Sequence, residues 1–253
     1  MQKFSPEQFS RDLVIFTDGS SLGNPGPGGY GCVVVFPQLD EVVELGGNKL
    51  KTTNNEMELS AVIAALSHTM FNTAPAHIFT DSSYVINGIT KWVRGWERNG
   101  WKTQTKSDVA NKSLWETLVG LVRERERSSN ISWHYVPGHV GVIGNERCDE
   151  ICTGFAAGKP PVLFRGKLSD YVKNHRDILT ITIDESLQQE KSDKRARSNA
   201  PAYSYLSLVD GVAMRHATWA ECEARVKGKQ AKFKKALSAE NEQEILREWG
   251  ASL

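Results

Sequence analysis

Two aspartates in this chain of 253 residues stand at the ends of similar apolar runs. Asp18 follows the run Leu-Val-Ile-Phe-Thr, and Asp81 follows the run Ala-His-Ile-Phe-Thr. Short runs rich in β-branched and aromatic residues are typical of buried strands. If these strands are neighbours in one sheet, the two carboxylates lie side by side at its edge. A single acid at such a place usually caps a turn, whereas a matching pair favours a functional site.

Two expected helices carry further acids at the margin of their apolar stripe. In the first helix, Glu58 lies one turn before Val62 of that stripe, whereas Glu56 suits a first turn, where acids are favourable. Periodicity does not choose between Glu56 and Glu58. In the later helix, Asp149 falls next to Cys152 of the stripe. An acid directed towards the scaffold needs a partner, and a metal ion is one candidate.

Four carboxylates brought together repel one another unless cations neutralise them. Carboxylate oxygens without a Cys or His ligand favour hard ions, chiefly Mg²⁺, with Mn²⁺ as the substitute. Two such ions about 4 Å apart can activate a water and stabilise the leaving oxygen of a phosphodiester. His139 lies in a glycine-punctuated loop three residues past a strand. A lone histidine is more often structural, but from a loop its imidazole could move a proton.

Two segments point to a nucleic acid as the substrate. The connection from Gly19 to Gly29 is richer in glycine than a plain hairpin, and such a backbone can come close to an anion. Residues 91–106 carry five Lys or Arg against one acid, interleaved with three tryptophans. Charges suit phosphates, and rings suit sugars and bases. The alternative is that the tryptophans belong to the core, and we expect this of at least one of them.

The sequence pattern predicts the strands and helices that position these residues. Strands are expected on both sides of the glycine-rich connection, then at 41–50, at 76–81 and at 131–136. Asn54 or Asn55 is the expected N-cap of the first helix, and Asn145 that of the helix with Asp149. Farther on, residues 178–184 form a strand-like run whose partner the sequence does not indicate.

Composition is that of an ordinary soluble globular protein, with 40% hydrophobic and 24% charged residues. The formal net charge of +1 says little about partners. Four cysteines without CxxC spacing make a zinc site improbable and are typical of a reduced compartment. The N-terminal stretch holds no apolar run, so we expect no signal peptide, no membrane span and a cytoplasmic, monomeric protein.

The motifs TDGSSLGNPGPGGYG, TTNNEMEL, FTDSSYV and GHVGVIGNERCDE, with the Trp- and Lys-rich segment, resemble type 1 ribonuclease H over roughly residues 12–158. The resemblance implies an α/β ribonuclease H-like fold with a five-stranded mixed sheet flanked by helices. It also implies an endonuclease that hydrolyses the RNA strand of RNA–DNA hybrids with two Mg²⁺ ions per site. Its implied catalytic residues are Asp18, Glu58, Asp81, His139 and Asp149, all but His139 as metal ligands.

The resemblance also implies contacts to each strand of the hybrid. On the RNA side these are Asn24, Asn54 and Asn55. The basic protrusion that grips the DNA strand corresponds to the segment with Trp92, Trp96, Trp101 and Lys102. Ser83 departs from the family pattern, since some relatives carry Gln at that position.

The last fifty residues form an expected small α+β domain with a hairpin about Asp210-Gly211. They resemble the hybrid-binding, viroplasmin-like domain attached to many type 1 ribonucleases H, although that domain usually precedes the nuclease. The implied duplex contacts are Trp219, Phe233, Lys234 and Lys235, and a structural basic hairpin is the alternative. The expected domains are therefore a catalytic domain at 11–160, an extension and flexible linker at 161–200, and a hybrid-binding domain at 201–253.

Two other functions compete with a hybrid-cutting endonuclease. One is a non-catalytic hybrid-binding protein with a decayed nuclease site, against which the presence of all four acids argues. The other is the nuclease part of a reverse-transcribing element, for which the chain offers no polymerase region.

Overall fold

The computed structural model describes residues 1–138, 141–175, 177–183 and 200–253. These residues form two compact units, one within Met1–Ser186 and the other within Leu187–Leu253. In the part of the chain that the structure describes, no helix combines the length and the apolar character needed to cross a bilayer.

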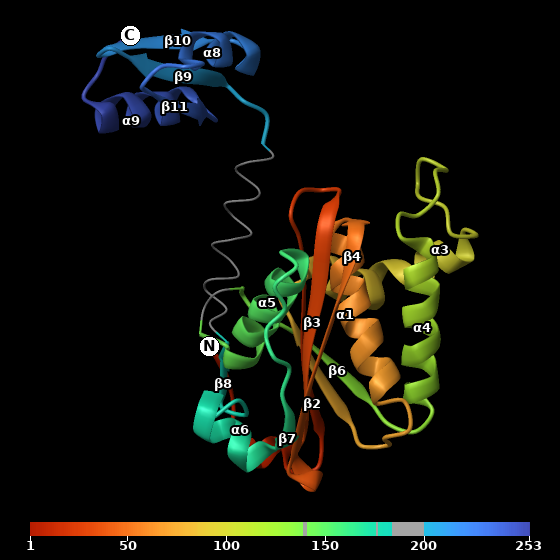
Figure 1. The fold of residues 1–253 in the computed structure, drawn as a ribbon. Helices are drawn as coiled ribbons and strands as arrows, with labels where there is room; N and C mark the ends of the chain where they lie inside the picture. Colours follow the sequence, from red (N-terminus) through yellow and green to blue (C-terminus); the bar gives the residue numbers. More distant parts are fainter. Residues whose placement is uncertain (139–140, 176, 184–199) are drawn as a thin grey trace. The chain divides into compact units, whose positions relative to one another are not determined.

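The first unit is built on a mixed six-stranded sheet in the order β6-β5-β2-β3-β4-β7 (Figure 1). Its strands are β2 (Leu13–Ser21), β3 (Gly26–Phe36), β4 (Glu41–Thr52), β5 (Ala76–Thr80), β6 (Ile131–Tyr135) and β7 (Arg165–Lys167). β5 runs parallel to β2 and β6, and the other neighbours are antiparallel. The α/β fold with a mixed sheet is confirmed, but the expected strand count of five was wrong. β7, from the segment after residue 160, pairs with β4 and adds the sixth strand.

The register between β2 and β5 fixes the edge at which the two repeated motifs end. Leu13 lies opposite Ala76, and the parallel pairing continues to Thr17 opposite Thr80. The next residue of each strand run is an aspartate, so Asp18 and Asp81 meet at one edge of the sheet, as the sequence predicts.

Helices cover both faces of this sheet (Figure 1). α1 (Asn54–His68) and α4 (Lys112–Glu126) lie on one face, and α5 (Ile143–Ala156) lies on the other. Because successive strand residues point to opposite faces, Leu13 and Ile15 enter the core beneath α1, whereas Val14 and Phe16 enter the core beneath α5. Between β5 and α4 the chain forms α2 (Ser83–Asn87), the helical turn η3 (Gly88–Trp92) and α3 (Val93–Arg98).

Residues outside the expected catalytic domain complete the core beneath α5. The additional elements are β1 (Gln2–Phe4), η1 (Pro6–Phe9), α6 (Leu168–His175) and β8 (Ile181–Ile183). Within the expected domain, the short helix η2 (Pro37–Leu39) links β3 to β4. β8 pairs with β1, which supplies the partner that the sequence did not indicate. Phe9, Tyr171 and Ile181 are buried in the core beneath α5. The flexible linker expected before residue 200 falls largely on residues 184–199, which lie outside the described residues.

The second unit is a small α+β domain. Its antiparallel sheet has the order β10-β9-β11, formed by β9 (Ser204–Val209), β10 (Val212–His216) and β11 (Ala231–Ala236). α8 (Trp219–Val226) and α9 (Ala239–Trp249) accompany the sheet. Asp210 and Gly211 both have positive φ, 52° and 78°, which is the backbone of a type I′ hairpin turn. The predicted hairpin is therefore confirmed.

Candidate active site

The start of α1 resolves the choice between two glutamates. Thr53 is the N-cap, since its hydroxyl accepts the Glu56 amide hydrogen while the Glu56 carboxylate accepts the Thr53 amide, with an N···O distance of 3.0 Å. Glu56 is thus occupied in a capping box. The expected N-cap at Asn54 or Asn55 was wrong because Thr53 precedes both. Asn145 is not a cap either, since α5 begins two residues earlier and buries it.

Four carboxylates converge in two overlapping groups at the sheet edge. Oxygen atoms of Asp18, Glu58 and Asp81 lie within 4.8 Å of one another. Oxygen atoms of Asp18 and Asp149 lie within the same distance of each other and of the Cys152 sulfur. Asp18 belongs to both groups, which is the arrangement that two neighbouring cations need for a shared ligand. Sequence reasoning missed Cys152 as a neighbour of the site; its position beside Asp149 on the helix face was the available signal.

Burial makes these carboxylates unfavourable as isolated anions. Asp18 and Glu58 are each only 7% exposed. Burial raises the pKa of Asp18 to about 8, and the charges of Asp81 and Asp149 act in the same direction against the Gly19 amide hydrogen bond. Burial, followed by the charges of Asp18 and Asp81, also raises the pKa of Glu58 well above its ordinary value.

Glu58 has an additional feature that fits a cation. Its Oε2 atom is buried and has no hydrogen-bond partner among the described residues, whereas its Oε1 accepts from Asn54 Nδ2 at 3.3 Å. A buried carboxylate oxygen without a partner is costly. All-oxygen donor sets of this kind suit Mg²⁺ or Mn²⁺, so the residues present fit such an ion.

Glycines allow the ligand-bearing helices to lie directly on the sheet. A Cβ atom on Gly19 would collide with the backbone nitrogen of Glu58 in α1. A Cβ atom on Gly29 would collide with the carbonyl oxygen of Cys152 in α5. These two glycines therefore permit close helix packing, and the approach of the connection to an anion stays a prediction.

Of the asparagines expected to contact nucleic acid, Asn54 donates to the Glu58 carboxylate. Asn24, Asn54 and Asn55 are exposed, and the Asn54 amide donates to Asn24 Oδ1 at 3.4 Å. His139 lies outside the described residues. Its neighbour Gly138 is placed against Asp81, because a Cβ atom there would collide with Asp81 Oδ2.

The three tryptophans of the basic segment divide between surface and core. Trp92 is 39% exposed, whereas Trp96 and Trp101 pack against the core beneath α1. The Trp96 ring centroid lies 5.7 Å from that of Trp92 and 5.5 Å from that of the buried Trp115. Lys102 is exposed and pairs with Asp108 at 2.6 Å. The expectation that at least one tryptophan belongs to the core is confirmed.

In the second unit, two of the four expected contact residues form an aromatic pair. Trp219 and Phe233 are 40% and 51% exposed, and their ring centroids are 5.4 Å apart. Tyr205, which sequence reasoning missed, extends this pair at 5.8 Å from Trp219. Lys234 Nζ lies 2.7 Å from Glu248 Oε2, and Lys235 Nζ donates to the Ala200 carbonyl oxygen at 2.7 Å.

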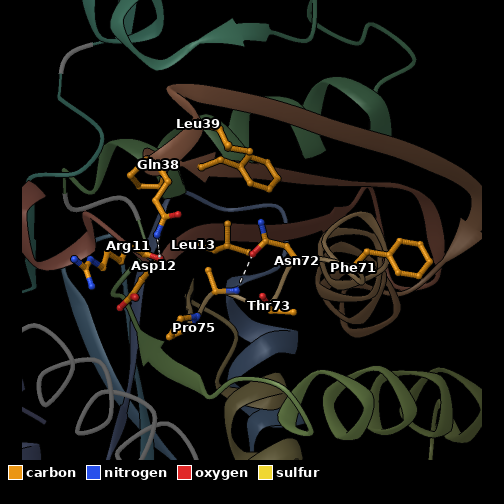
Figure 2. Close-up of a pocket in the computed structure, with 12 residues that line it drawn as sticks. Arg11, Asp12, Leu13, Gln38, Leu39, Phe71, Asn72, Thr73 and Pro75 are labelled. Carbon is orange, nitrogen blue, oxygen red and sulfur yellow. Dashed lines mark hydrogen bonds between the residues drawn. The ribbon is translucent and has the colours of Figure 1, made fainter.

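A separate cavity of about 480 Å³ lies where β2 begins, at the opposite end of that strand from Asp18 (Figure 2). Figure 2 shows Gln38 reaching the Arg11 carbonyl oxygen, with an Nε2···O distance of 3.0 Å. Asp12 is the sole carboxylate among the described residues that line the cavity, and it pairs with His77. This cavity therefore lacks the ligand set found around Asp18.

A mixed sheet that brings four carboxylates to one edge, between helices on both faces, defines a metal-dependent nuclease. The RNase H family model matches residues 10–156, more than half of the chain, and the chain belongs to this family. The family is metal-dependent, and the protein is a ribonuclease H enzyme.

Curated relatives and a solved structure agree with this assignment. The chain is 48% identical over 153 residues to a ribonuclease H of Cyanothece sp., which covers 59% of this chain and 92% of the relative. It is 45% identical over 149 residues to a ribonuclease H of Pseudoalteromonas atlantica, with 59% and 93% covered. It is also similar to the crystal structure of LC9-RNase H1, a type 1 RNase H with the type 2 active-site motif. That similarity has 25% identity, a TM-score of 0.54, and coverage of 68% of this chain and 89% of the other.

Proposed function

We propose that this enzyme hydrolyses the RNA strand of RNA–DNA hybrids, with two Mg²⁺ ions held by Asp18, Glu58, Asp81 and Asp149. The observation that carries the proposal is the pair of carboxylate groups that share Asp18. Bound cations would supply an activated water and stabilise the leaving oxygen of the phosphodiester. The carboxylates orient that chemistry, and the buried Glu58 Oε2, which lacks a hydrogen-bond partner among the described residues, gives further support to a ligand role.

The surroundings of the site support a hybrid as the substrate. Asn54 lies beside the Glu58 carboxylate, Asn24 contacts Asn54, and Asn55 follows in α1. The exposed amides of these residues can bond to 2′-hydroxyls or phosphates of the RNA strand. Trp92, packed against the partly buried Trp96, and Lys102 offer a surface for the DNA strand. Ribonuclease H is also the name of the relatives described above.

His139 is assigned the movement of a proton or the release of product. The loop that carries it begins at Gly138, against the Asp81 carboxylate. A histidine there can exchange a proton near neutral pH. Its role differs from that of the ligands, since its loss leaves the carboxylates in place.

A strand-resolved cleavage assay tests the nuclease function. The full chain is incubated with Mg²⁺ and a hybrid labelled on either strand, beside single-stranded RNA, duplex RNA and duplex DNA. We expect cleavage of the RNA strand of the hybrid alone, and none in excess EDTA. Glu58→Gln is expected to lower the rate by orders of magnitude, whereas the matched variant Glu56→Gln keeps it. Hybrid binding without cleavage by the wild type would instead support the non-catalytic alternative.

We further propose that residues 201–253 tether the enzyme to the hybrid through Trp219, Phe233, Lys234 and Lys235. Exposed aromatic rings beside lysines suit a nucleic-acid backbone. The Lys234–Glu248 pair is about half exposed, and ion pairs of this kind contribute little. Lys234 can therefore exchange Glu248 for a phosphate. Tethering raises the effective concentration of substrate at the nuclease site.

Salt dependence of hybrid affinity tests the tether. Lys234→Ala with Lys235→Ala is expected to lower the slope of log affinity against log salt by about one for each lost phosphate contact. Glu248→Gln, which frees Lys234, serves as the matched control and is expected to keep or increase affinity. A chain ending at Ala200 should bind more weakly yet cleave normally at saturating hybrid. Equal affinities and slopes for full-length and shortened chains would remove the tether from the proposal.

A further inference from the structure

Glu44 is a further buried carboxylate, outside the metal site. It lies on β4, and its side chain has no exposed surface. Arg147 of α5 binds it through two hydrogen bonds, from Nε to Oε1 and from Nη2 to Oε2, each 2.7 Å long. Tyr171 and the Phe164 amide donate to the same carboxylate at 2.8 Å each. Glu44 thus receives four hydrogen bonds from three separate parts of the chain.

Arg147 connects this carboxylate to the nuclease site. It precedes the expected ligand Asp149 by two residues in the same helix. Its Nη1 donates to Glu150 Oε2 at 2.7 Å, and its Nη2, which also bonds to Glu44, donates to the Val162 carbonyl oxygen at 3.0 Å. Any shift of Arg147 along or around α5 is transmitted to Asp149, because a helix moves as a rigid element.

Residues 162–171 hold the ion pair in place from outside the catalytic motifs. This segment supplies the Val162 carbonyl, the Phe164 amide and the Tyr171 hydroxyl. β7 within it pairs with β4, and the Leu168 amide donates to the Asp40 carbonyl oxygen at 2.9 Å. The segment therefore attaches α5 to the edge of the sheet.

The surroundings of the Glu44–Arg147 ion pair favour the charged form of Glu44. Burial alone would raise the pKa of Glu44, but the hydrogen bonds from Arg147, the Phe164 amide and Tyr171 hold that pKa below its ordinary value. A bidentate arginine–carboxylate pair has a fixed geometry. Removing the carboxylate leaves a mostly buried arginine without its main partner, which is more disruptive than losing an exposed pair.

A small rotation of α5 would matter to the metal site. A carboxylate about 6 Å from a helix axis moves about 1 Å when the helix rolls by about 10°. Misplacement on that scale costs catalytic groups about a hundredfold in rate or affinity. Gly29 and Gly31 lie directly beneath α5, and the bidentate Glu44–Arg147 pair adds a contact of fixed geometry between this helix and β4.

We propose that Glu44, Arg147 and Tyr171 are positioning residues that fix the rotation of α5, so that Asp149 faces Asp18. Residues 162–171 then contribute to nuclease function by holding Asp149 in position. This inference rests on the proposed function, in which Asp149 is a cation ligand.

The test compares Glu44→Gln and Tyr171→Phe with two controls. Glu150→Gln removes the exposed partner of the same arginine, and Leu118→Ala destabilises the opposite core without touching α5. For each full-length variant we measure Mn²⁺ binding by electron paramagnetic resonance without nucleic acid, the melting temperature, and hybrid cleavage against Mg²⁺ concentration.

Glu44→Gln is expected to weaken Mn²⁺ binding and raise the half-saturating Mg²⁺ concentration by about tenfold. The cleavage rate should recover at saturating Mg²⁺. Tyr171→Phe should shift both quantities less and in the same direction, and neither control should shift them.

Wild-type Mn²⁺ affinity in Glu44→Gln and Tyr171→Phe, with a lowered melting temperature like that of Leu118→Ala, would overturn the inference. If Glu44→Gln does not fold, the milder Tyr171→Phe decides the question. Failure of the wild type to cut hybrid would defeat the proposed function, while Mn²⁺ binding would still decide the positioning role.

Discussion

We expect the free energy of unfolding of the metal-free protein to fall as the pH rises, because of Asp18. Its pKa rises from the ordinary 3.8 to about 8 in the folded protein. Between those values the unfolded chain loses the proton while the folded protein keeps it, so deprotonation favours unfolding. At about 1.4 kcal/mol for each pH unit, the whole shift corresponds to about 6 kcal/mol. This contribution is fully present below pH 3.8 and is lost by about pH 8.

In the upper part of this pH range, His134, whose titration changes the free energy of unfolding in the opposite direction, no longer contributes to the pH dependence. Burial, and then the charge of His77, lowers the pKa of His134 from 6.5 to about 4. That depression contributes stability above pH 6.5 that is lost as the pH falls towards 4. From pH 6.5 to pH 8, therefore, His134 is neutral in both states and Asp18 still titrates, while the raised pKa of Glu58 acts in the same direction as that of Asp18. The expected loss from Asp18 over this window is about 2 kcal/mol.

Urea unfolding in EDTA at pH 6.5 and pH 8, the limits set by His134 and Asp18, measures this loss. Wild type should lose about 2 kcal/mol more unfolding free energy than Asp18→Asn over this window, because Glu58 titrates in both proteins, and Asp18→Asn should be the more stable protein at the higher pH. Excess Mg²⁺ should restore wild-type stability and leave the variant unchanged, since ligands that bind only the folded state stabilise it. Parallel pH profiles for the two proteins in EDTA would refute the buried-carboxylate reasoning.

Two further perturbations separate the roles of individual residues. His139→Ala should slow turnover yet keep measurable cleavage and wild-type Mn²⁺ binding, whereas Asp81→Asn should abolish cleavage; equal losses in a hybrid cleavage assay would show that the histidine is indispensable. Gly19→Ala should displace the backbone of Glu58 and lower both the melting temperature and Mn²⁺ affinity, because the added Cβ has no room. Gly120→Ala in α4, where a Cβ meets nothing within 4 Å, is the control and should raise stability by up to about 1 kcal/mol.

Local patterns were sufficient to predict part of the site. Asp18 and Asp81 end similar strand motifs, and parallel register then brings them together without further information. The choice between Glu56 and Glu58 needed more than periodicity, since both positions are compatible with one helix. The capping box at Thr53 decided between the two glutamates. The sequence did not indicate this cap because Asn54 and Asn55, which directly follow Thr53, also suit an N-cap.

Contacts between distant residues account for what sequence patterns did not predict. Glu44 lies 103 residues from Arg147 and 127 from Tyr171. A glutamate within a strand gives no sign that it is fully buried until those partners are known. β7 pairs with β4 across a similar interval, so the sixth strand was not expected. The same holds for Gly29. A glycine is required at this position because α5, more than a hundred residues away in the sequence, packs directly against it.

The most direct test of the central claim is cleavage of a hybrid with one non-bridging oxygen of the scissile phosphate replaced by sulfur. If cations held by the carboxylates around Asp18 contact that phosphate, one sulfur diastereomer should be cut far more slowly than the normal hybrid in Mg²⁺. Mn²⁺, which accepts sulfur more readily, should restore much of the lost rate. Equal slowing in Mg²⁺ and Mn²⁺ for both diastereomers would contradict a mechanism in which these carboxylates bring metal ions to the phosphodiester.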